Sequence, residues 1–343
     1  MNRPTIAAMI GACLSLGLSG TASAQDKIEL RFADSLPATH LFTRELAQPW
    51  MDAVTEKTNG SITFQHFPAQ QLGKARDMLS LANSGVADIA FVVPIYITDK
   101  LPLSGLYDLP GGPFTSCQGV EAFMSLATGD GLLARDEYAP NGVRVLMAVV
   151  QPPFQVFTAS KKIESINDLV GLKLRTAGGA QEITATKLGI IPVKITAPET
   201  SEAMSRGTID GGILAPVSIG AYGLTDLIKY ATDGANFGSA ALTWSISEKK
   251  FQSLPAEVQD IMVEEGRRIT MQACKAIEKG VDDAIAQWRS TGVKIVEFPE
   301  AEQAELTAMF EEIGNDWAVS LDARNLPGSE ALAAFKKALG TAK

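Results

Sequence analysis

The sequence of 343 residues predicts an α/β protein of two lobes, each a β-sheet flanked by helices, with one long helix spanning both lobes. Three observations support this fold class. Segments with strand and helix patterns alternate along the chain, which is typical of α/β folds. The alternation stops and starts again near residue 143, and the length favours about two domains. A helical pattern over 255–289 would be about 50 Å long, which exceeds one small domain.

The first series of elements begins after residue 27. Residues 28–33 alternate apolar and polar side chains, as in a half-buried strand, and run into a loop at Asp34. Apolar side chains at helical spacing predict a helix over 42–58, which Asn59-Gly60 ends. The same reasoning predicts, in order, a strand over 61–67, a helix over 74–83 and a fully buried strand over 88–93.

The second series predicts another sheet with its own helices. In order, it consists of strands over 143–150 and 154–159, a capped turn over 165–169, a strand over 172–175, a helix over 182–188, a strand over 190–196, a helix over 199–206 and a strand over 208–214. We expect residues 25–150 plus about 233–254 to form lobe I. Residues 151–232 plus the C-terminal helices are expected to form lobe II.

The long helix over 255–289 is expected to brace the two lobes. Pro255 stands at a position that proline favours at the start of a helix, and apolar residues recur at every third or fourth position after it. A kink at Gly266 or Gly280 is the alternative, because glycine weakens a helix interior.

Residues 1–24 have the pattern of a signal peptide. Arg3 precedes an apolar stretch, and the segment closes on Ala22-Ser23-Ala24, which fits a signal-peptidase site. A membrane anchor is the first alternative, but the apolar stretch is shorter than the roughly 20 residues that a spanning helix needs. A lipoprotein site at Ala12-Cys13 is the second. The sequence therefore predicts cleavage after Ala24 and a periplasmic protein that is not embedded in the membrane.

Composition excludes several partners and cofactors. The 30 Lys and Arg residues against 39 Asp and Glu give a net charge of -9, and nucleic-acid binding needs basic surfaces. Only His40 and His66 are present, and the three cysteines show no C-x-x-C spacing, so neither a metal site nor a cofactor is expected. After export, Cys117 and Cys274 could form a disulfide. Two buried free thiols is the preferred interpretation, because sequence cannot place their Cα atoms within bridging distance.

The common catalytic and nucleotide-binding motifs are missing. No G-x-G-x-x-G, G-x-x-x-x-G-K-[ST] or G-x-S-x-G occurs, and Ser247-Glu248-Lys249-Lys250 matches S-x-x-K without the companion motifs of that hydrolase class. No catalytic residue is predicted, and the protein is not expected to be an enzyme. A secreted hydrolase or lyase that uses Asp34, His40 or a serine is the alternative.

Two side chains are candidates for ligand contact because they follow predicted strands. Arg175 ends the strand over 172–175 and precedes a helix, so its guanidinium would face the crevice where anions bind. A surface arginine in an ion pair is the alternative. His40 lies in the loop after the first strand, and ligands approach open sheets at such loops. His66 lies inside a strand pattern and is interpreted as a structural residue.

The chain resembles the solute-binding proteins of tripartite ATP-independent periplasmic (TRAP) transporters over essentially its whole length after the predicted signal peptide. The resemblance depends on the order and spacing of several segments rather than on any one. These are Phe67-Pro68-Ala69-Gln70-Gln71-Leu72-Gly73, Ser84-Gly85-Val86-Ala87-Asp88-Ile89-Ala90, Ile166-Asn167-Asp168-Leu169-Val170-Gly171-Leu172-Lys173-Leu174-Arg175, Leu188-Gly189 to Pro192, Pro198-Glu199 through Ser205-Arg206-Gly207-Thr208-Ile209-Asp210-Gly211, and Ser253-Leu254-Pro255-Ala256-Glu257.

The resemblance implies a periplasmic-binding-protein-like fold and a receptor without chemistry. Such a receptor, expected to be a monomer, closes around a small organic anion and delivers it to the membrane permease of the transporter. In this family the arginine that matches Arg175 forms a salt bridge with a substrate carboxylate. The helix from Pro255 matches the helix that runs along both lobes. A binding protein of an ABC-type transporter would share the lobed architecture and is the alternative.

Departures from the family pattern indicate the kind of ligand. No asparagine occurs in 212–218, where many dicarboxylate and sialic-acid receptors have one, and no basic residue occurs in 151–155. A second carboxylate would therefore lack a partner. We expect an apolar wall instead, and a monocarboxylate with an apolar or aromatic body as the ligand. A C4-dicarboxylate is the alternative. The wall would consist of Tyr96, Phe154, Ala215, Pro216 and Phe237, although Phe237 could equally belong to the core.

Overall fold

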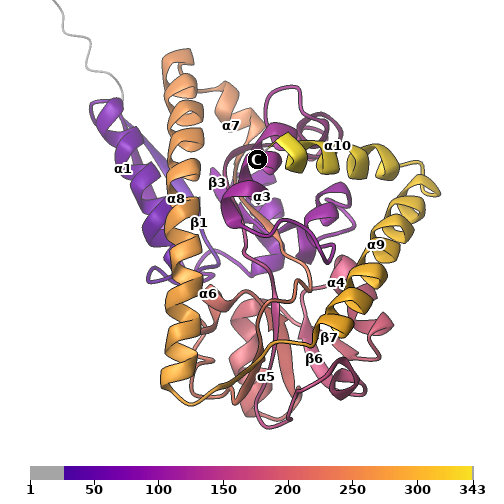
Figure 1. Ribbon diagram of the computed structural model, residues 1–343. Helices are drawn as coiled ribbons and strands as arrows, with labels where there is room; N and C mark the ends of the chain where they lie inside the picture. Colours follow the sequence, from indigo (N-terminus) through magenta and orange to yellow (C-terminus); the bar gives the residue numbers. More distant parts are fainter. Residues whose placement is uncertain (1–26, 342–343) are drawn as a thin grey trace, which may run out of the picture.

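Two β-sheets form the centres of two lobes in the computed structural model, which describes residues 27–341 (Figure 1). The first sheet has the order β2-β1-β3-β10-β4, from β1 (Ile28–Ala33), β2 (Ile62–Phe67), β3 (Ile89–Val92), β4 (Val143–Val150) and β10 (Ala241–Ser247). The second has the order β11-β9-β5-β8-β6-β7, from β5 (Gln155–Thr158), β6 (Lys173–Thr176), β7 (Ile191–Lys194), β8 (Gly211–Leu214), β9 (Tyr230–Thr232) and β11 (Lys294–Val296). The predicted two-lobed α/β fold is confirmed.

Both sheets are mixed rather than parallel throughout. Strand β1 pairs in parallel with β2 and β3, whereas β10 runs antiparallel to β3 and β4. In the second sheet β6 is parallel to β7 and β8, whereas β5 is antiparallel to β8 and β9. The carboxyl ends of β1, β3 and β4 therefore share one edge of the first sheet, and those of β6, β7 and β8 share one edge of the second.

Helices and short helical turns cover the two sheets. The α-helices are α1 (Gln48–Lys57), α2 (Met78–Asn83), α3 (Ser116–Ala127), α4 (Gly179–Lys187), α5 (Thr200–Ser205), α6 (Pro216–Ile219), α7 (Glu248–Gln252), α8 (Ala256–Ser290), α9 (Glu300–Asp322) and α10 (Gly328–Thr341). The short turns are η1 (Thr43–Ala47), η2 (Ala75–Asp77), η3 (Pro94–Tyr96), η4 (Leu103–Tyr107), η5 (Ala134–Tyr138), η6 (Ile166–Leu169) and η7 (Ala197–Glu199).

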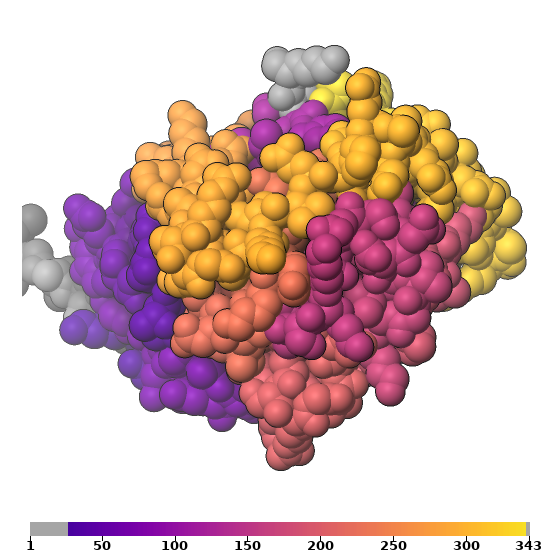
Figure 2. All heavy atoms as spheres, turned by 60° about the horizontal axis from the view of Figure 1, so that its bottom comes forward, coloured from indigo at the N-terminus to yellow at the C-terminus, as the bar shows by residue number. Residues whose placement is uncertain are grey.

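Helix α8 is the long helix expected from the sequence, and it contacts both lobes. It packs on α1, α3 and β4 of the first lobe and on α6 and β11 of the second. Figure 2 shows its orange residues between the indigo residues of the first lobe and the pink residues of the second. The helix is continuous through both glycines considered as kinks. A Cβ atom on Gly266 would lie 2.1 Å from the carbonyl oxygen of Leu146, so this glycine permits close approach to β4.

The C-terminal helices do not all lie with the second lobe, contrary to our expectation. Helix α9 packs on α4 of the second lobe, but α10 packs on α3 and η4 of the first. The ring of Phe335 on α10 lies 4.7 Å from that of Tyr107, and Ala331 and Leu332 are also buried. The apolar face of α10 therefore completes the core of the first lobe, which is a contact that helical periodicity does not specify.

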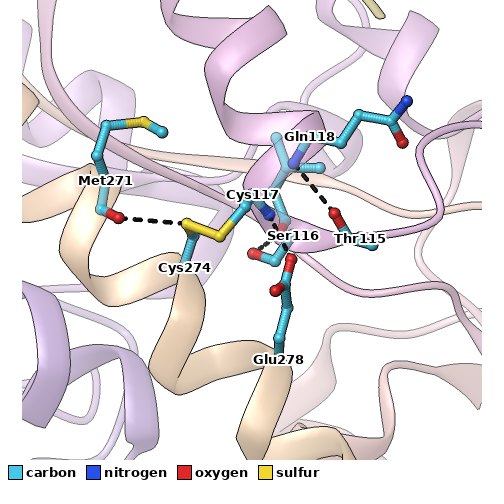
Figure 3. The surroundings of a disulfide bond; sticks show 8 residues. Thr115, Ser116, Cys117, Gln118, Met271, Cys274 and Glu278 are labelled. Carbon is cyan, nitrogen blue, oxygen red and sulfur yellow. Dashed lines mark hydrogen bonds between the residues drawn. A yellow bond between two sulfur atoms is a disulfide. The ribbon is translucent and has the colours of Figure 1, made fainter. Parts of the chain in front are cut away.

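Cys117 and Cys274 form a disulfide, so the preferred prediction of two free thiols was wrong (Figure 3). Their Cα atoms are 4.9 Å apart although 157 positions separate them in the sequence. Glu278, one turn after Cys274 on α8, accepts a hydrogen bond of 2.9 Å from the backbone N–H of Cys117 at the start of α3. The disulfide and this bond fix the middle of α8 to the first lobe.

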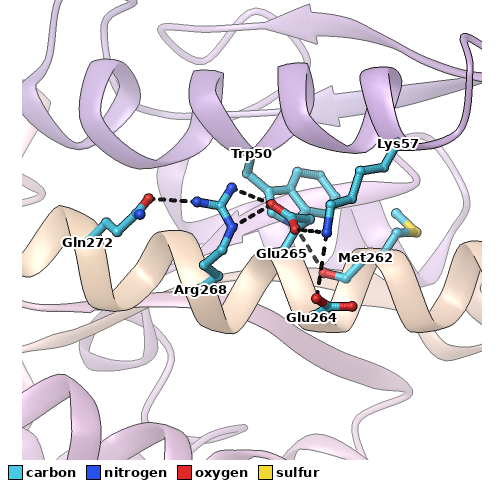
Figure 4. A network of polar contacts seen from close by, with 7 residues as sticks. All are labelled: Trp50, Lys57, Met262, Glu264, Glu265, Arg268 and Gln272. Carbon is cyan, nitrogen blue, oxygen red and sulfur yellow. Dashed lines mark hydrogen bonds and ion pairs between the residues drawn. The ribbon is translucent and has the colours of Figure 1, made fainter.

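A buried carboxylate joins α8 to α1 as well (Figure 4). The side chain of Glu265 is fully buried, its Oε1 lies 2.6 Å from Lys57 Nζ, and its Oε2 pairs with Arg268. Trp50 on α1 donates a hydrogen bond of 3.1 Å to the carbonyl oxygen of Met262. The hydrogen bond from Arg268 lowers the pKa of Glu265, so the carboxylate stays charged at neutral pH.

Asp34 directly follows β1 and holds the loop after it on the first sheet. Its Oδ1 accepts a hydrogen bond of 2.8 Å from Leu36 N–H, and its Oδ2 accepts one of 3.2 Å from Trp244 Nε1 on β10. Burial raises the pKa of Asp34 to about 7, despite these two donors. His66 Nε2 lies 4.0 Å from Asp34 Oδ2, and the His66 ring packs edge-on against Phe32, in agreement with a structural role.

Loss of the disulfide should destabilise the protein. Replacing both cysteines by serine, C117S/C274S, is expected to lower the free energy of unfolding by about 2–5 kcal/mol, because the bond closes a long loop in the unfolded chain. Urea unfolding followed by circular dichroism would measure the difference. A reductant should destabilise the wild-type protein similarly and leave the double variant unchanged; equal stability of both proteins without reductant would contradict the expectation.

Asp34 should make stability depend on pH. Its folded pKa of about 7 exceeds the ordinary 3.8, so the folded state keeps a proton that the unfolded state loses. Stability should therefore fall as the pH rises from about 4 to about 7 and level off above. Relative to Asp34→Asn, the wild-type free energy of unfolding should fall by about 2–3 kcal/mol from pH 5 to pH 8. Parallel pH curves for the two proteins would show that Asp34 does not titrate in this range.

Candidate functional site

A cavity of about 30 Å³ lies where the carboxyl ends of strands from the two sheets meet. The first lobe and the strand connections contribute Ser35, Leu36, Phe91, Val93, Ile95, Tyr96, Gln151, Phe154, Ala240 and Leu242; the second lobe contributes Arg175, Ala177, Ala197, Pro198, Leu214 and Tyr222. A complete site therefore exists only when the two lobes are together.

Arg175 lies on β6 and reaches the cavity from inside the second sheet. The residue is 1% exposed, so the alternative of a surface arginine in an ion pair is excluded. Its Nε donates to the carbonyl oxygen of Ile195 at 2.8 Å, and its Nη1 donates to that of Ile213 at 3.0 Å. Gly212 pairs with Arg175 on the neighbouring strand, and a Cβ there would lie 3.1 Å from Arg175 Cβ. The glycine thus leaves room for the arginine.

The guanidinium of Arg175 has no acidic partner within residues 27–341. None of the ion pairs in this part of the chain includes it, and three of its five N–H donors are used by Ile195, Ile213 and Tyr96. Burial lowers the pKa of Arg175, but a guanidinium remains protonated in proteins. A buried charge of this kind is costly unless an ion of opposite sign binds beside it.

Tyr96 connects the lobes at the arginine. From η3 of the first lobe, its hydroxyl accepts a hydrogen bond of 2.9 Å from Ala197 N–H and one of 3.4 Å from Arg175 Nη2. The guanidinium of Arg76 lies 5.6 Å from the centre of the Tyr96 ring. Tyr96 lines the cavity and contributes a polar bridge between the lobes as well as apolar surface.

The apolar wall differs from the predicted one. Phe154 lines the cavity, and the other apolar side chains come from β3, β8 and β10, from η3 and η7, and from the loops after β1 and β6. Ala215, Pro216 and Phe237, which were expected in the wall, do not line this cavity. Leu214 takes that place on β8, and Phe237 packs against the rings of Phe298 and Phe310 at 6.3 and 6.1 Å.

His40, the second candidate for ligand contact, also lies outside the lining of the cavity. The residue is fully buried, and its Nδ1 accepts a hydrogen bond of 3.2 Å from Phe42 N–H. Burial, with a smaller effect of Arg44, lowers the pKa of His40 to about 3, so the ring is neutral at pH 7. Its ring centre lies 5.6 Å from that of Tyr222. His40 therefore supports a lining residue instead of being one.

Three polar lining residues were not predicted from the sequence: Ser35, Gln151 and Tyr222. Gln151 Nε2 donates a hydrogen bond of 3.4 Å to Ser218 Oγ on α6. Gln151 directly follows a buried strand, which is a signal that sequence reasoning could have used. Tyr222 lies beyond α6 in irregular structure, where no periodic pattern marks it.

The lining residues can hold an anion but contain no catalytic pair. Arg175 is the single charged side chain among them, and histidine, cysteine and lysine are missing. Within residues 27–341, no three His, Cys, Asp or Glu side chains gather at one place as a metal would need. In the same part of the chain, none of the helices combines the length and apolar character that crossing a membrane requires.

Comparison with known proteins identifies the family. A model of the bacterial extracellular solute-binding proteins of family 7 matches residues 32–319. The transporter protein TsaT of Comamonas testosteroni is 26% identical over 84% of this chain and 85% of its own, and the C4-dicarboxylate-binding periplasmic protein DctP of Rhodobacter capsulatus is 24% identical over 76% and 77%.

Solved structures share the fold over nearly the whole chain. A TRAP solute-binding protein from a marine metagenome, described as specific for aromatic acids, has a TM-score of 0.85 at 23% identity, covering 92% of this chain and 100% of its own. One from Bordetella bronchiseptica, solved with (R)- and (S)-mandelate, has a TM-score of 0.83 at 25% identity with the same coverage. The protein belongs to family 7 of the bacterial extracellular solute-binding proteins, whose solved structural relatives are receptors of TRAP transporters.

Proposed function

We propose that the protein is the periplasmic receptor of a TRAP transporter and binds a monocarboxylic acid with an aromatic or apolar body. The observation that carries this proposal is the buried Arg175, which has no acidic partner within residues 27–341. A carboxylate can accept two parallel hydrogen bonds from a guanidinium, and the pair fixes both orientation and charge. The two unused N–H donors of Arg175 suit such an acceptor.

The charge of the cavity supports a single carboxylate. Arg175 is the one charged residue that lines the cavity. Gln151 also lines it and lies in the segment 151–155, where the family pattern would place a second basic residue. A second carboxylate would lose its hydration without gaining a cation, which costs several kcal/mol. The observation disfavours the C4-dicarboxylate alternative.

The apolar lining supports an aromatic body. The rings of Phe91 and Phe154 and the side chains of Leu214 and Leu242 are buried around the cavity. Structural relatives have been solved with 3-hydroxybenzoate, benzoate and mandelate, although others hold malonate or pyroglutamate. An aromatic monocarboxylate matches both the charge and the surface of this cavity.

Export and delivery complete the proposed role. The predicted signal peptide, residues 1–24, lies outside the described residues, and it would direct the protein to the periplasm. We expect the exported protein to be a monomer. The chain passes between the sheets after β4 and again before β10, so both segments are candidate hinges. In the proposed cycle the lobes close on the acid and the membrane permease of the transporter receives it.

Removal of the guanidinium should abolish tight binding. Arg175→Ala is expected to weaken the binding of an aromatic acid by about 2–5 kcal/mol, at least thirtyfold in Kd, because the carboxylate would be buried without its partner. A thermal-shift screen of benzoate, its monohydroxy isomers, mandelate, malonate and succinate would first find the ligand. Titration calorimetry would then measure Kd in both proteins.

Arg206→Ala is the matched control, because Arg206 lies in the same lobe, is exposed and pairs with Glu202 away from the cavity. Arg175→Lys should also weaken binding, since an ammonium group cannot provide the planar fork. Wild-type affinity of Arg175→Ala, or preference for succinate over every aromatic acid, would contradict the proposal. Mass spectrometry of the recovered ligand tests the alternative of a hydrolase or lyase, which would return an altered molecule.

A further inference from the structure

The cavity contains oxygen atoms that the protein's own hydrogen bonds do not use. Five lining residues have polar side chains: Ser35, Tyr96, Gln151, Arg175 and Tyr222. The Tyr96 hydroxyl already accepts from Ala197 N–H and Arg175. By contrast, within residues 27–341 no side-chain hydrogen bond reaches the hydroxyl of Tyr222, the hydroxyl of Ser35 or Oε1 of Gln151. A ligand that consisted of a carboxylate and a hydrocarbon ring would leave these atoms unpaired.

Ser218 bonds to the side chain of Gln151 and to the backbone of Tyr222. Gln151 Nε2 donates to Ser218 Oγ at 3.4 Å, and Tyr222 N–H donates to the carbonyl oxygen of Ser218 at 3.3 Å. The ring of His40 packs against that of Tyr222 from the first lobe. Tyr222 and Gln151 are therefore positioned by their neighbours, and neither takes part in the hydrogen bonds that hold Arg175.

The chemistry of the pair suits a hydroxyl group. A phenol can donate one hydrogen bond and accept others, and an amide oxygen only accepts. Burial raises the pKa of Tyr222 well above its usual value, so its hydroxyl keeps its proton. A ligand hydroxyl could accept from Tyr222 and donate to Gln151 Oε1 at once. A site that has polar groups for a hydroxyl discriminates against an analogue without one, because those groups then remain unpaired.

We propose that Tyr222 and Gln151 recognise a hydroxyl group on the ligand, so that the receptor selects hydroxylated aromatic monocarboxylic acids over unsubstituted ones. This inference rests on the proposed function, in which Arg175 binds the carboxylate. It assigns the second point of recognition, and with it the selectivity among acids of one charge and similar size.

The test compares acids that differ in one group. Calorimetry on the full mature protein would measure Kd for benzoate, its three monohydroxy isomers and its three methyl isomers. At least one hydroxy isomer should bind about three- to tenfold more tightly than benzoate and than the matching methyl isomer, as expected for one buried hydrogen bond. Tyr222→Phe should remove most of that preference, so that the Kd of the preferred hydroxy isomer approaches that of benzoate. Gln151→Leu should reduce the preference as well.

Tyr96→Phe is the matched control, since the Tyr96 hydroxyl oxygen accepts hydrogen bonds from Arg175 and Ala197 and so supports the carboxylate-binding guanidinium. This variant should weaken all the acids alike. The inference is overturned if no hydroxy isomer is preferred, if Tyr222→Phe weakens all acids equally, or if Ser35→Ala alone removes the preference. If none of the acids binds to the wild-type protein, the proposed function itself fails, which is a different result from binding without hydroxyl preference.

Discussion

A positive charge buried between two lobes is the constraint on which the rest of the site depends. The Arg175 guanidinium is held by the carbonyl oxygens of Ile195 and Ile213 and by the Tyr96 hydroxyl, all of them neutral acceptors. These bonds fix its orientation without neutralising it. Gly212 on the adjacent strand makes space for the side chain. Within residues 27–341 the charge is oriented, desolvated and not paired with an acid, which is the arrangement expected of an anion receptor.

The architecture brings the two halves of the site together and holds the long helix on the first lobe. Tyr96 of the first lobe bonds directly to Ala197 and Arg175 of the second, so the two lobes contact each other at the arginine that lines the cavity. The Cys117–Cys274 disulfide and the buried Glu265 fix α8 to α3 and α1. Since α8 also contacts α6 and β11, it connects the second lobe to the first.

The polar residues that suggested catalysis have structural roles. Asp34 is bonded to Leu36 N–H and Trp244, and burial raises its pKa. His40 is buried, neutral and packed on Tyr222. Neither lines the cavity, and the residues that do include no histidine or acidic side chain. A single guanidinium with phenol, amide and serine oxygens can orient and select a small acid, which agrees with membership of a family of solute-binding proteins.

Local periodicity in the sequence is enough to predict the alternation of strands and helices, the long helix and the place of Arg175 at the end of a strand. Tertiary structure alone decided the pairing of Cys117 with Cys274, the packing of α10 on the first lobe and the antiparallel placement of β5 and β10. It also decided that Leu214 and Tyr222 line the cavity while Ala215 and Phe237 do not. These features depend on contacts between segments far apart in the chain, and no local pattern encodes which distant side chain will fill a given space.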